Sequence, residues 1–240
     1  MGKVADVVTT KLTSPIFVAL DLDSDIEALK LAKDLRPYVG GFKIGPRLTY
    51  KYGSLFVKKL ADIGTVFVDN KYHDIPSTVL AALRCTFESG ASFVTLHASN
   101  GYSAMKEFAK LEIELSRERP FQILSVTVMT SFDESSLPSN WRPQTVRSHV
   151  EALAQETIVA GLSGIVCSPD EVSTLRSKFP EAFLVTPGIR LPGDHKGDQL
   201  RVMGPSEAIQ AGASALVIGR PIVAAADPVL AAKKIYDLIG

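Results

Sequence analysis

The chain has 240 residues, of which 46% are hydrophobic and 22% are charged, as is typical of water-soluble globular proteins. Its 26 basic residues balance its 26 acidic residues, so the composition gives no reason to expect a nucleic acid as partner. We find no signal-peptide-like run in residues 1–14 and no apolar stretch approaching the roughly 20 residues of a membrane span. The two cysteines, Cys85 and Cys167, lack a redox or metal spacing. We therefore expect a cytoplasmic protein with no membrane partner.

Short apolar runs rich in β-branched residues recur eight times. They are Ile16 to Leu22, Gly41 to Ile44, Thr65 to Val68, Ser92 to Leu96, Ile123 to Val128, Gly164 to Cys167, Ala182 to Val185 and Ala215 to Ile218. Stretches with helical periodicity lie between them, as in Ile26, Leu29, Ala32 and Leu35. This alternation predicts a parallel sheet that closes into a (β/α)8 TIM barrel, with one domain over residues 1–240. A doubly wound open sheet is the alternative.

Helix-start signals support this order of elements. Ser24 precedes the first helical stretch, Pro76 opens the third, and Ser168 precedes the sixth. Two longer segments lack periodicity. For residues 131–143, after the fifth strand, we expect a short helix over the barrel mouth. The segment 187–204, after the seventh strand, is rich in glycine, proline and charge, and such a length in a compact domain is usually functional.

The most informative segment is Asp-Asn-Lys-Tyr-His-Asp at residues 69–74, directly after an apolar strand. Because side chains alternate along a strand, Asp69 and Lys71 are expected on one face and Asn70 on the other. One explanation is an ion pair that closes the barrel or crosses an interface. The other is a catalytic array, in which Asp69 and Asp74 keep Lys71 protonated as a proton donor.

Every predicted strand ends in polar residues or in a glycine beside an arginine. In barrels of this type the active site lies at the carboxyl ends of the strands, where these residues would meet. The strand-end residues are Asp21, Lys43, Asp69 with Lys71, His97, Thr130, Ser168, the segment from Pro187 to Arg190, and Gly219 with Arg220.

Arg190 and Arg220 follow the seventh and eighth strands, and Gly188 and Gly219 stand close to them. Phosphate-binding barrels build their anion site at this place from backbone N–H groups and basic side chains. Glycine lets the backbone approach a phosphate closely. We infer a substrate with one phosphate group and expect Arg220 to be its main guanidinium contact.

The histidines leave two alternatives open. His97 ends the fourth strand and is either a hydrogen-bonded barrel residue or a group that supports the site. His73 could bind a metal with Asp69 and Asp74, but Lys71 would compete for the carboxylates, so we expect no metal. The sequence contains no dinucleotide-binding loop, P-loop or serine nucleophile motif, and no cofactor is expected.

These motifs together resemble one family, the orotidine 5'-phosphate decarboxylases. The resemblance covers nearly the whole chain. It is carried by residues 18–21 (Val-Ala-Leu-Asp), 42–45 (Phe-Lys-Ile-Gly), 69–76 (Asp-Asn-Lys-Tyr-His-Asp-Ile-Pro), 95–98 (Thr-Leu-His-Ala), 186–190 (Thr-Pro-Gly-Ile-Arg) and 219–220 (Gly-Arg). It implies a cofactor-free enzyme that converts orotidine 5'-phosphate into uridine 5'-phosphate, the last step of uridine monophosphate synthesis.

The resemblance also implies roles for residues at matching positions. Lys71 would protonate C6 of the pyrimidine, and Asp69 would face the departing carboxylate. Asp21 and Lys43 would hold the ribose hydroxyls. The resemblance further implies a homodimer in which Asp74 enters the neighbouring subunit's site. The remaining substrate contacts would be Ile75 and Thr78 across the interface, Thr130 at the pyrimidine, Gln199 between base and phosphate, and Pro187, Arg190, Gly219 and Arg220 around the phosphate end.

The chain departs from the family pattern at Asn70, Ser77 and Asn100, all of them away from the reacting groups. Asn70 should face the helices and needs a hydrogen-bond partner there. Three rival functions remain open. They are a magnesium-dependent decarboxylase of 3-keto sugar acid phosphates, a phosphosugar isomerase or epimerase, and a nucleotide-binding protein without activity. Gln199 and Thr130 favour the pyrimidine substrate.

Overall fold

The structure is a computed structural model that describes residues 12–191 and 202–239. Eight parallel strands pair in chain order and close into a barrel, because β8 pairs with β1. The barrel prediction is therefore confirmed, and the open-sheet alternative is wrong. The strands are β1 (Ile16–Ala19), β2 (Gly41–Ile44), β3 (Val66–Tyr72), β4 (Phe93–His97), β5 (Gln122–Val126), β6 (Gly164–Val166), β7 (Phe183–Thr186) and β8 (Ala215–Ile218).

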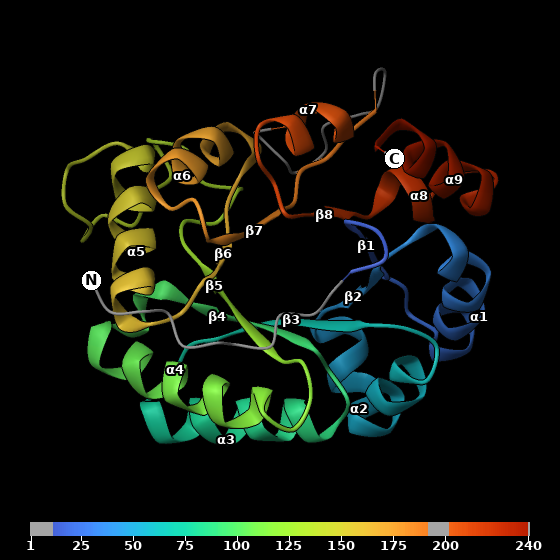
Figure 1. The fold of residues 1–240 in the computed structure, drawn as a ribbon, viewed down its shortest axis with the longest axis horizontal. Helices are drawn as coiled ribbons and strands as arrows, with labels where there is room; N and C mark the ends of the chain where they lie inside the picture. The colour runs from blue at the N-terminus through green and yellow to red at the C-terminus, as the bar shows by residue number, and fades with distance from the viewer. Residues whose placement is uncertain (1–11, 192–201, 240) are drawn as a thin grey trace.

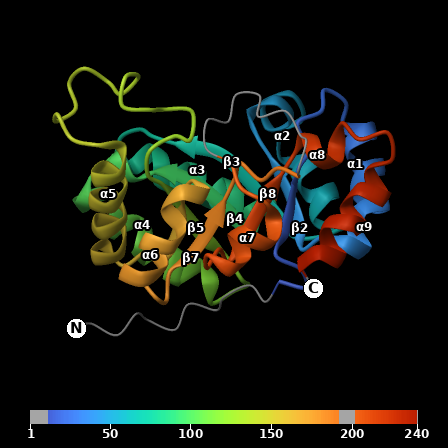
Figure 2. The same ribbon diagram turned by 90° about the horizontal axis from the view of Figure 1, so that it is seen from above.

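The helices surround the strands (Figure 1). They are α1 (Asp25–Leu35), α2 (Pro46–Ala61), α3 (Pro76–Glu88), α4 (Tyr102–Ser116), α5 (Val146–Ala160), α6 (Val172–Lys178), α7 (Pro205–Gln210), α8 (Arg220–Val223) and α9 (Pro228–Ile239). Three short 3-10 turns, at Arg36–Tyr38, Ala98–Asn100 and Pro169–Glu171, complete the connections in the described part of the chain. Figure 2 shows α1, α8 and α9 together at one edge of the molecule. No helix in the described residues is long and apolar enough to cross a membrane.

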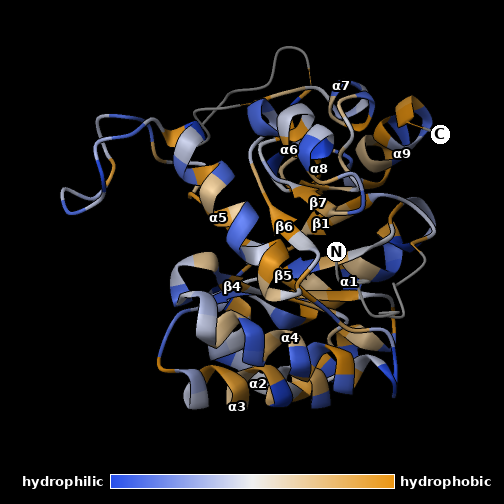
Figure 3. Ribbon diagram, turned by 60° about the vertical axis from the view of Figure 1, so that its left-hand side comes forward, coloured by the Kyte–Doolittle hydropathy of each residue, from blue (hydrophilic) through white to orange (hydrophobic). Residues whose placement is uncertain are grey.

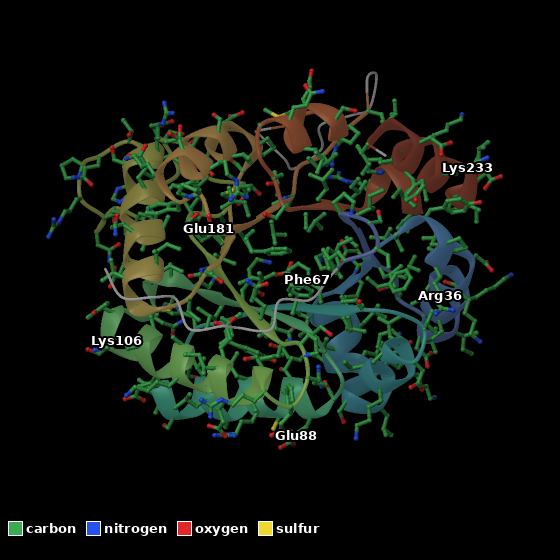
Figure 4. All side chains as sticks on the ribbon, in the orientation of Figure 1. Arg36, Phe67, Glu88, Lys106, Glu181 and Lys233 are labelled. Carbon is green, nitrogen blue, oxygen red and sulfur yellow. The ribbon has the colours of Figure 1, made fainter. Side chains whose placement is uncertain are left out.

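Aromatic side chains fill one end of the barrel interior. The ring of Phe93 lies 5.3 Å from that of Phe17 and stacks at 5.6 Å on that of Phe183, between ring centroids. Phe67 meets Phe17 edge to face at 5.8 Å, and Figure 4 shows Phe67 inside the ring of strands. These inward-facing residues make the barrel interior a packed core and not an open channel.

A second apolar layer lies between the strands and the helices. The apolar positions that we expected on the inner side of α1, at Ala32 and Leu35, are fully buried. Ile26, which begins the same periodic pattern, is exposed and lies in the first turn of the helix. Figure 3 shows hydrophobic residues gathered on the strands and mixed with hydrophilic residues on the helices. This distribution is the amphipathic pattern that the sequence predicts.

The expected helix starts are present. The Ser24 hydroxyl accepts a hydrogen bond from the backbone N–H of Glu27 and so caps α1. Pro76 occupies the first turn of α3, where its missing N–H costs no hydrogen bond. Ser168 and Glu171 form a capping box at the turn before α6.

One local prediction is wrong: residues 131–143 form turns and bends, with no helix. The Asp133 carboxylate accepts hydrogen bonds from the backbone N–H groups of Ser135 and Ser136, which fixes a turn in place of a helical one. The proline at position 138 lacks an N–H to continue a helix. Ser131 lines the cavity at the carboxyl end of the barrel, and the segment extends outward from there beside α5 (Figure 3).

Candidate active site at the carboxyl end of the barrel

A cavity of about 600 Å³ opens at the carboxyl ends of the strands. This volume is within the usual range for small-molecule sites, roughly 300–1,000 Å³. The structure brings most of the predicted strand-end residues together around it. The predicted residues that line the cavity are Asp21, Lys43, Asp69, Lys71, Thr130, Pro187, Gly188, Arg190, Gly219 and Arg220.

Four of these residues form a row of alternating charge. Lys43 Nζ lies 3.5 Å from Asp21 Oδ1 and 3.5 Å from Asp69 Oδ2, and Lys71 Nζ lies 2.9 Å from Asp69 Oδ1. Exposure changes along the row: the Asp21 side chain is 61% exposed, Asp69 14% and Lys71 38%. The buried carboxylate therefore lies between two ammonium groups that both line the cavity, and that of Lys71 is the more exposed. Removing either lysine would leave Asp69 with a single cation, which is costly for a charge so poorly hydrated.

The pKa of Asp69 lies below its ordinary value of 3.8. Burial is the largest single influence and raises this pKa. The charges of Lys43 and Lys71, together with hydrogen bonds from Lys71 and Thr95, lower the pKa by more than burial raises it. The carboxylate is thus ionised at neutral pH although it is buried.

The backbone of β3 is irregular where it carries the charged residues. Its pairing with β4 runs from Val68 opposite Val94 to Tyr72 opposite Leu96, so three residues of β3 face one residue of β4. Within this bulge Lys71 has φ of 50°, and it is the only non-glycine residue with positive φ in the described ranges. L-residues rarely adopt this conformation, and where it occurs it often marks a functional site.

Asn70 faces the helices, as predicted, and it has partners there. Its Oδ1 accepts a hydrogen bond from the Thr49 hydroxyl of α2 at 3.0 Å, and its Nδ2 donates to the Tyr72 hydroxyl at 3.3 Å. Asp69 and Lys71 lie on the opposite face, against the cavity. The expected alternation of faces therefore holds even though the strand backbone is irregular.

Two arginines, Arg190 and Arg220, line the part of the cavity wall that follows β7 and β8. Arg220 begins α8 directly after Gly219 and is exposed. Arg190 lines the same cavity but is only 9% exposed, and its Nη1 donates a hydrogen bond to the Ile189 carbonyl at 2.8 Å. Gly188 has φ of 84°, a left-handed conformation that suits glycine. Gly219 packs against Ala19, to which an added Cβ would come within 3.4 Å. The residues expected to form an anion site thus line one cavity, and Arg220 is the more exposed of its two arginines.

Three predicted site residues, Asp74, Ile75 and Thr78, do not line the cavity of their own chain. They lie where β3 leads into α3, and Ile75 is 65% exposed. The Asp74 carboxylate accepts a hydrogen bond from the Ile75 backbone N–H. The side chain of Asn100 fixes this connection, because its amide donates to the carbonyls of Tyr72 and His97. Asp74 therefore does not extend the row of charges within one chain.

Two residues at the site, Arg47 and Thr95, were not predicted from the sequence. Arg47, in the first turn of α2, lines the cavity and lies 3.4 Å from Asp23. Its position just after the end of β2 was the available signal. Thr95 contacts both Asp69 and Lys71 from β4. Gln199 lies outside the described residues.

His97 is half-buried near the charged row. Burial, together with the like charges of His73 and Lys71, lowers its pKa, although Asp69 acts in the opposite direction. Its ring centroid lies 5.5 Å from that of His73, whose Nε2 is 3.3 Å from the Ser99 carbonyl. Residues 12–191 and 202–239 contain no group of three or more side chains placed to hold a metal ion.

A closed eight-stranded barrel with a row of alternating charges and an exposed arginine around one cavity defines a class of protein. It is a (β/α)8-barrel enzyme with a site for an anionic small molecule. Comparison with known proteins gives the family. The model of the orotidine 5'-phosphate decarboxylase / HUMPS family matches residues 14–235, so the chain belongs to that family.

Named relatives narrow the assignment within the family. The chain is 42% identical over 231 residues to the orotidine 5'-phosphate decarboxylase of Haemophilus influenzae (strain PittEE), covering 95% of this chain and all of the relative. It is 43% identical over 226 residues to that of Pasteurella multocida (strain Pm70), covering 93% and 97%. These similarities assign the chain to the decarboxylases of the family.

Solved structures agree with the fold. The crystal structure of the orotidine 5'-phosphate decarboxylase from Lactobacillus acidophilus superposes with a TM-score of 0.80 at 31% identity, covering 95% of this chain and 99% of the other. An uncharacterised conserved protein from Geobacillus kaustophilus gives a TM-score of 0.76 at 28% identity, covering 94% and 100%.

Proposed function

We propose that this protein decarboxylates orotidine 5'-phosphate to uridine 5'-phosphate and that Lys71 delivers the proton to C6. The observation that carries the proposal is the Lys71 ammonium, which reaches the cavity while Asp69 holds it at 2.9 Å. We treat residues 1–240 as one domain, which the closed barrel and the family match over residues 14–235 support. No cofactor takes part in the proposed reaction.

The reaction needs a stabilised negative charge and a nearby proton. Loss of carbon dioxide leaves an electron pair on C6, and the pyrimidine ring offers no simple site to receive it. A fixed ammonium group favours this developing charge more than it favours the neutral ground-state carbon. The same group can then transfer its proton to C6, which completes the product. Lys71 meets both requirements because its ammonium group carries both the charge and the proton. Asp69, which also contacts Lys43, fixes the position of that group at the cavity.

Asp69 has a second proposed role, beside the carboxylate of the substrate. Its lowered pKa keeps it negative, so a bound substrate carboxylate experiences repulsion that is relieved when carbon dioxide leaves. The two lysines next to Asp69 stabilise the anionic residue in the free enzyme. The protein is therefore able to keep the Asp69 carboxylate negatively charged beside the position proposed for the substrate carboxylate.

The remainder of the cavity suits the nucleotide. Arg220 is an exposed guanidinium at the end of β8 and is proposed to bind the phosphate, with the Gly219 backbone beside it. Asp21 and Lys43, joined at 3.5 Å, are proposed to hold the ribose hydroxyls. Thr130 lines the cavity and is proposed to contact the pyrimidine. Pro187 and Arg190 complete the wall at the phosphate end.

We further propose a homodimer in which Asp74 enters the site of the neighbouring subunit, accompanied by Ile75 and Thr78. Two observations support this arrangement. Asp74 stands outside its own cavity, and Ile75 is a large apolar residue left 65% exposed beside it. A neighbouring subunit seated on this connection would bury the Ile75 side chain and take Asp74 into its own site.

Subunit mixing tests the shared site. Lys71→Ala and Asp74→Ala homodimers should both be inactive, yet a mixed dimer has one site with both residues intact. Random reassortment should therefore restore about a quarter of the parental activity, because half of the dimers are mixed and half of their sites are complete. A mixture of Lys71→Ala with Lys43→Ala is the control and should stay inactive. No recovery in the first mixture would contradict the shared site.

The decisive test of the activity follows the ultraviolet absorbance of orotidine 5'-phosphate in the presence of a chelator. The parent protein should consume the substrate, Lys71→Ala should be nearly silent, and Lys106→Ala, on the outer surface of α4, should match the parent (Figure 4). Binding of uridine 5'-phosphate by Lys71→Ala shows that its cavity is intact. A silent parent, with chelator or with added magnesium, would overturn the assignment in favour of keto-sugar phosphates.

A further inference from the structure

The hydroxyl of Thr95 lies at the centre of the β3 bulge. Between two paired positions, β3 contains Asp69, Asn70 and Lys71, whereas β4 contains only Thr95. A regular parallel ladder would give the Lys71 N–H a backbone carbonyl as acceptor. At the bulge this N–H donates to Thr95 Oγ1 instead, at 2.9 Å. The threonine side chain therefore replaces a ladder hydrogen bond at the residue with the unusual positive φ.

The same hydroxyl contacts the buried carboxylate. Thr95 Oγ1 lies 2.9 Å from Asp69 Oδ1, which is also the oxygen that receives the Lys71 ammonium at 2.9 Å. Chemistry fixes the direction of both hydrogen bonds. A backbone N–H can only donate and an ionised carboxylate can only accept, so the hydroxyl accepts from Lys71 and donates its single proton to Asp69. One oxygen atom thus links the backbone of Lys71 to the partner of its ammonium group.

Thr95 is fully buried and does not line the cavity. It cannot touch a substrate there, so any effect on the reaction has to pass through Asp69 and Lys71. We propose that Thr95 is a positioning residue, whose hydroxyl holds the Lys71 backbone in its left-handed conformation and the Asp69 carboxylate in register with the ammonium group. This inference rests on the proposed role of Lys71 in decarboxylation.

Loss of the hydroxyl should affect both ends of the Lys71 side chain. The backbone N–H would lose its acceptor in a buried place, so φ at Lys71 would relax toward a more common value. The Asp69 carboxylate would lose a donor and could rotate, which moves the atom that orients the ammonium group. A displacement of about 1 Å at a reacting group can lower a rate by a factor of about 100. Binding of the distant phosphate at Arg220 would not change.

Three variants test the proposal. Thr95→Val keeps the shape of the side chain without the hydroxyl, and Thr95→Ser keeps the hydroxyl. Thr157→Val is the matched control: Thr157 is also fully buried and its hydroxyl also donates a hydrogen bond, to Ser125 Oγ or the Leu153 carbonyl, but it lies on α5 behind the sheet. Thermal unfolding of all three shows whether each variant is folded under assay conditions.

In turnover of orotidine 5'-phosphate we expect kcat of Thr95→Val to fall by about tenfold to a hundredfold, with KM and uridine 5'-phosphate affinity changed by less than about threefold. Thr95→Ser should recover most of kcat, and Thr157→Val should keep it. An unchanged kcat in Thr95→Val, a rise in KM alone, or a serine variant as slow as the valine variant would each overturn the proposal.

Hydrogen exchange at the Lys71 amide gives a reading that does not depend on activity. Protein labelled with ¹⁵N-lysine should show a protected Lys71 N–H in the parent and in Thr95→Ser, and faster exchange in Thr95→Val. Equal protection in all three would refute the hydrogen bond as the holding element. A parent protein that does not turn over orotidine 5'-phosphate would refute the proposed function, while the exchange data would still decide whether Thr95 positions Lys71.

Discussion

Glu112 is a buried acid outside the active site, and replacing it with glutamine should change how stability depends on pH. It lies on α4 and is fully buried, and its Oε1 accepts a hydrogen bond from the Ile123 backbone N–H at 2.6 Å, beside the start of β5. Its Oε2 is buried without a hydrogen-bond partner among the described residues. Burial raises the pKa of this carboxyl to about 8, and the single hydrogen bond from Ile123 offsets only part of that effect.

The direction in which pH changes the free energy of unfolding follows from the number of protons that the folded and unfolded states bind. In the unfolded chain Glu112 titrates at about its ordinary pKa of 4.5, whereas in the folded protein it stays protonated up to about pH 8. Between these values the folded state binds one more proton, so unfolding becomes easier as pH rises. The loss is about 1.4 kcal/mol per pH unit, and it stops once pH exceeds the folded pKa. Glutamine keeps an acceptor for Ile123 and has no proton to lose.

The assay is urea unfolding of the parent and Glu112→Gln at several pH values from 4 to 8. The difference in unfolding free energy, variant minus parent, should grow in favour of the variant as pH rises, because shared titrations cancel. Glu114→Gln is the control on the same helix. Glu114 is exposed and its hydrogen bond with Arg84 lowers its pKa, so its replacement should bring a small loss above pH 4.5 and no gain. A pH-independent difference for Glu112→Gln would refute the reasoning.

Two further predictions concern the barrel core and the charged row. Phe93→Ala removes a fully buried ring that contacts Phe17 and Phe183, so it should cost about 3–5 kcal/mol in urea unfolding, with Phe93→Leu losing clearly less; equal losses would exclude a cavity as the cause. The lowered pKa of Asp69 in the ligand-free protein should keep kcat/KM free of an acid limb from this carboxylate down to about pH 4, because its charge is lost only as pH falls through its folded pKa. Lys43→Met removes one of the two charges that lower this pKa, so the pKa of the Asp69 carboxyl, followed by carbon NMR in the ligand-free protein, should rise, and an unmoved pKa would show that Lys43 does not stabilise the Asp69 anion.

The sequence alone determined the barrel and the residues around its open end. Strand and helix periodicity differ enough that eight apolar runs separated by amphipathic stretches leave few alternatives to a closed parallel sheet. The position of a residue at a strand end then places it at the cavity, which is why Asp21, Lys43, Asp69 and Arg220 could be named in advance. The faces of Asn70 and Lys71 followed from alternation in the same way.

How those residues meet depends on the tertiary structure. The β3 bulge and the left-handed Lys71 depend on pairing with β4, and the hydroxyl that accepts the Lys71 N–H belongs to Thr95, 24 residues further along the chain. Turn formation at Asp133 overrode the expected helix, because local side-chain hydrogen bonds compete with helical ones. The place of Asp74 outside its own cavity also depends on the path of the chain into α3. Periodicity reports which face a residue occupies, whereas contacts between separate strands depend on packing that no local pattern encodes.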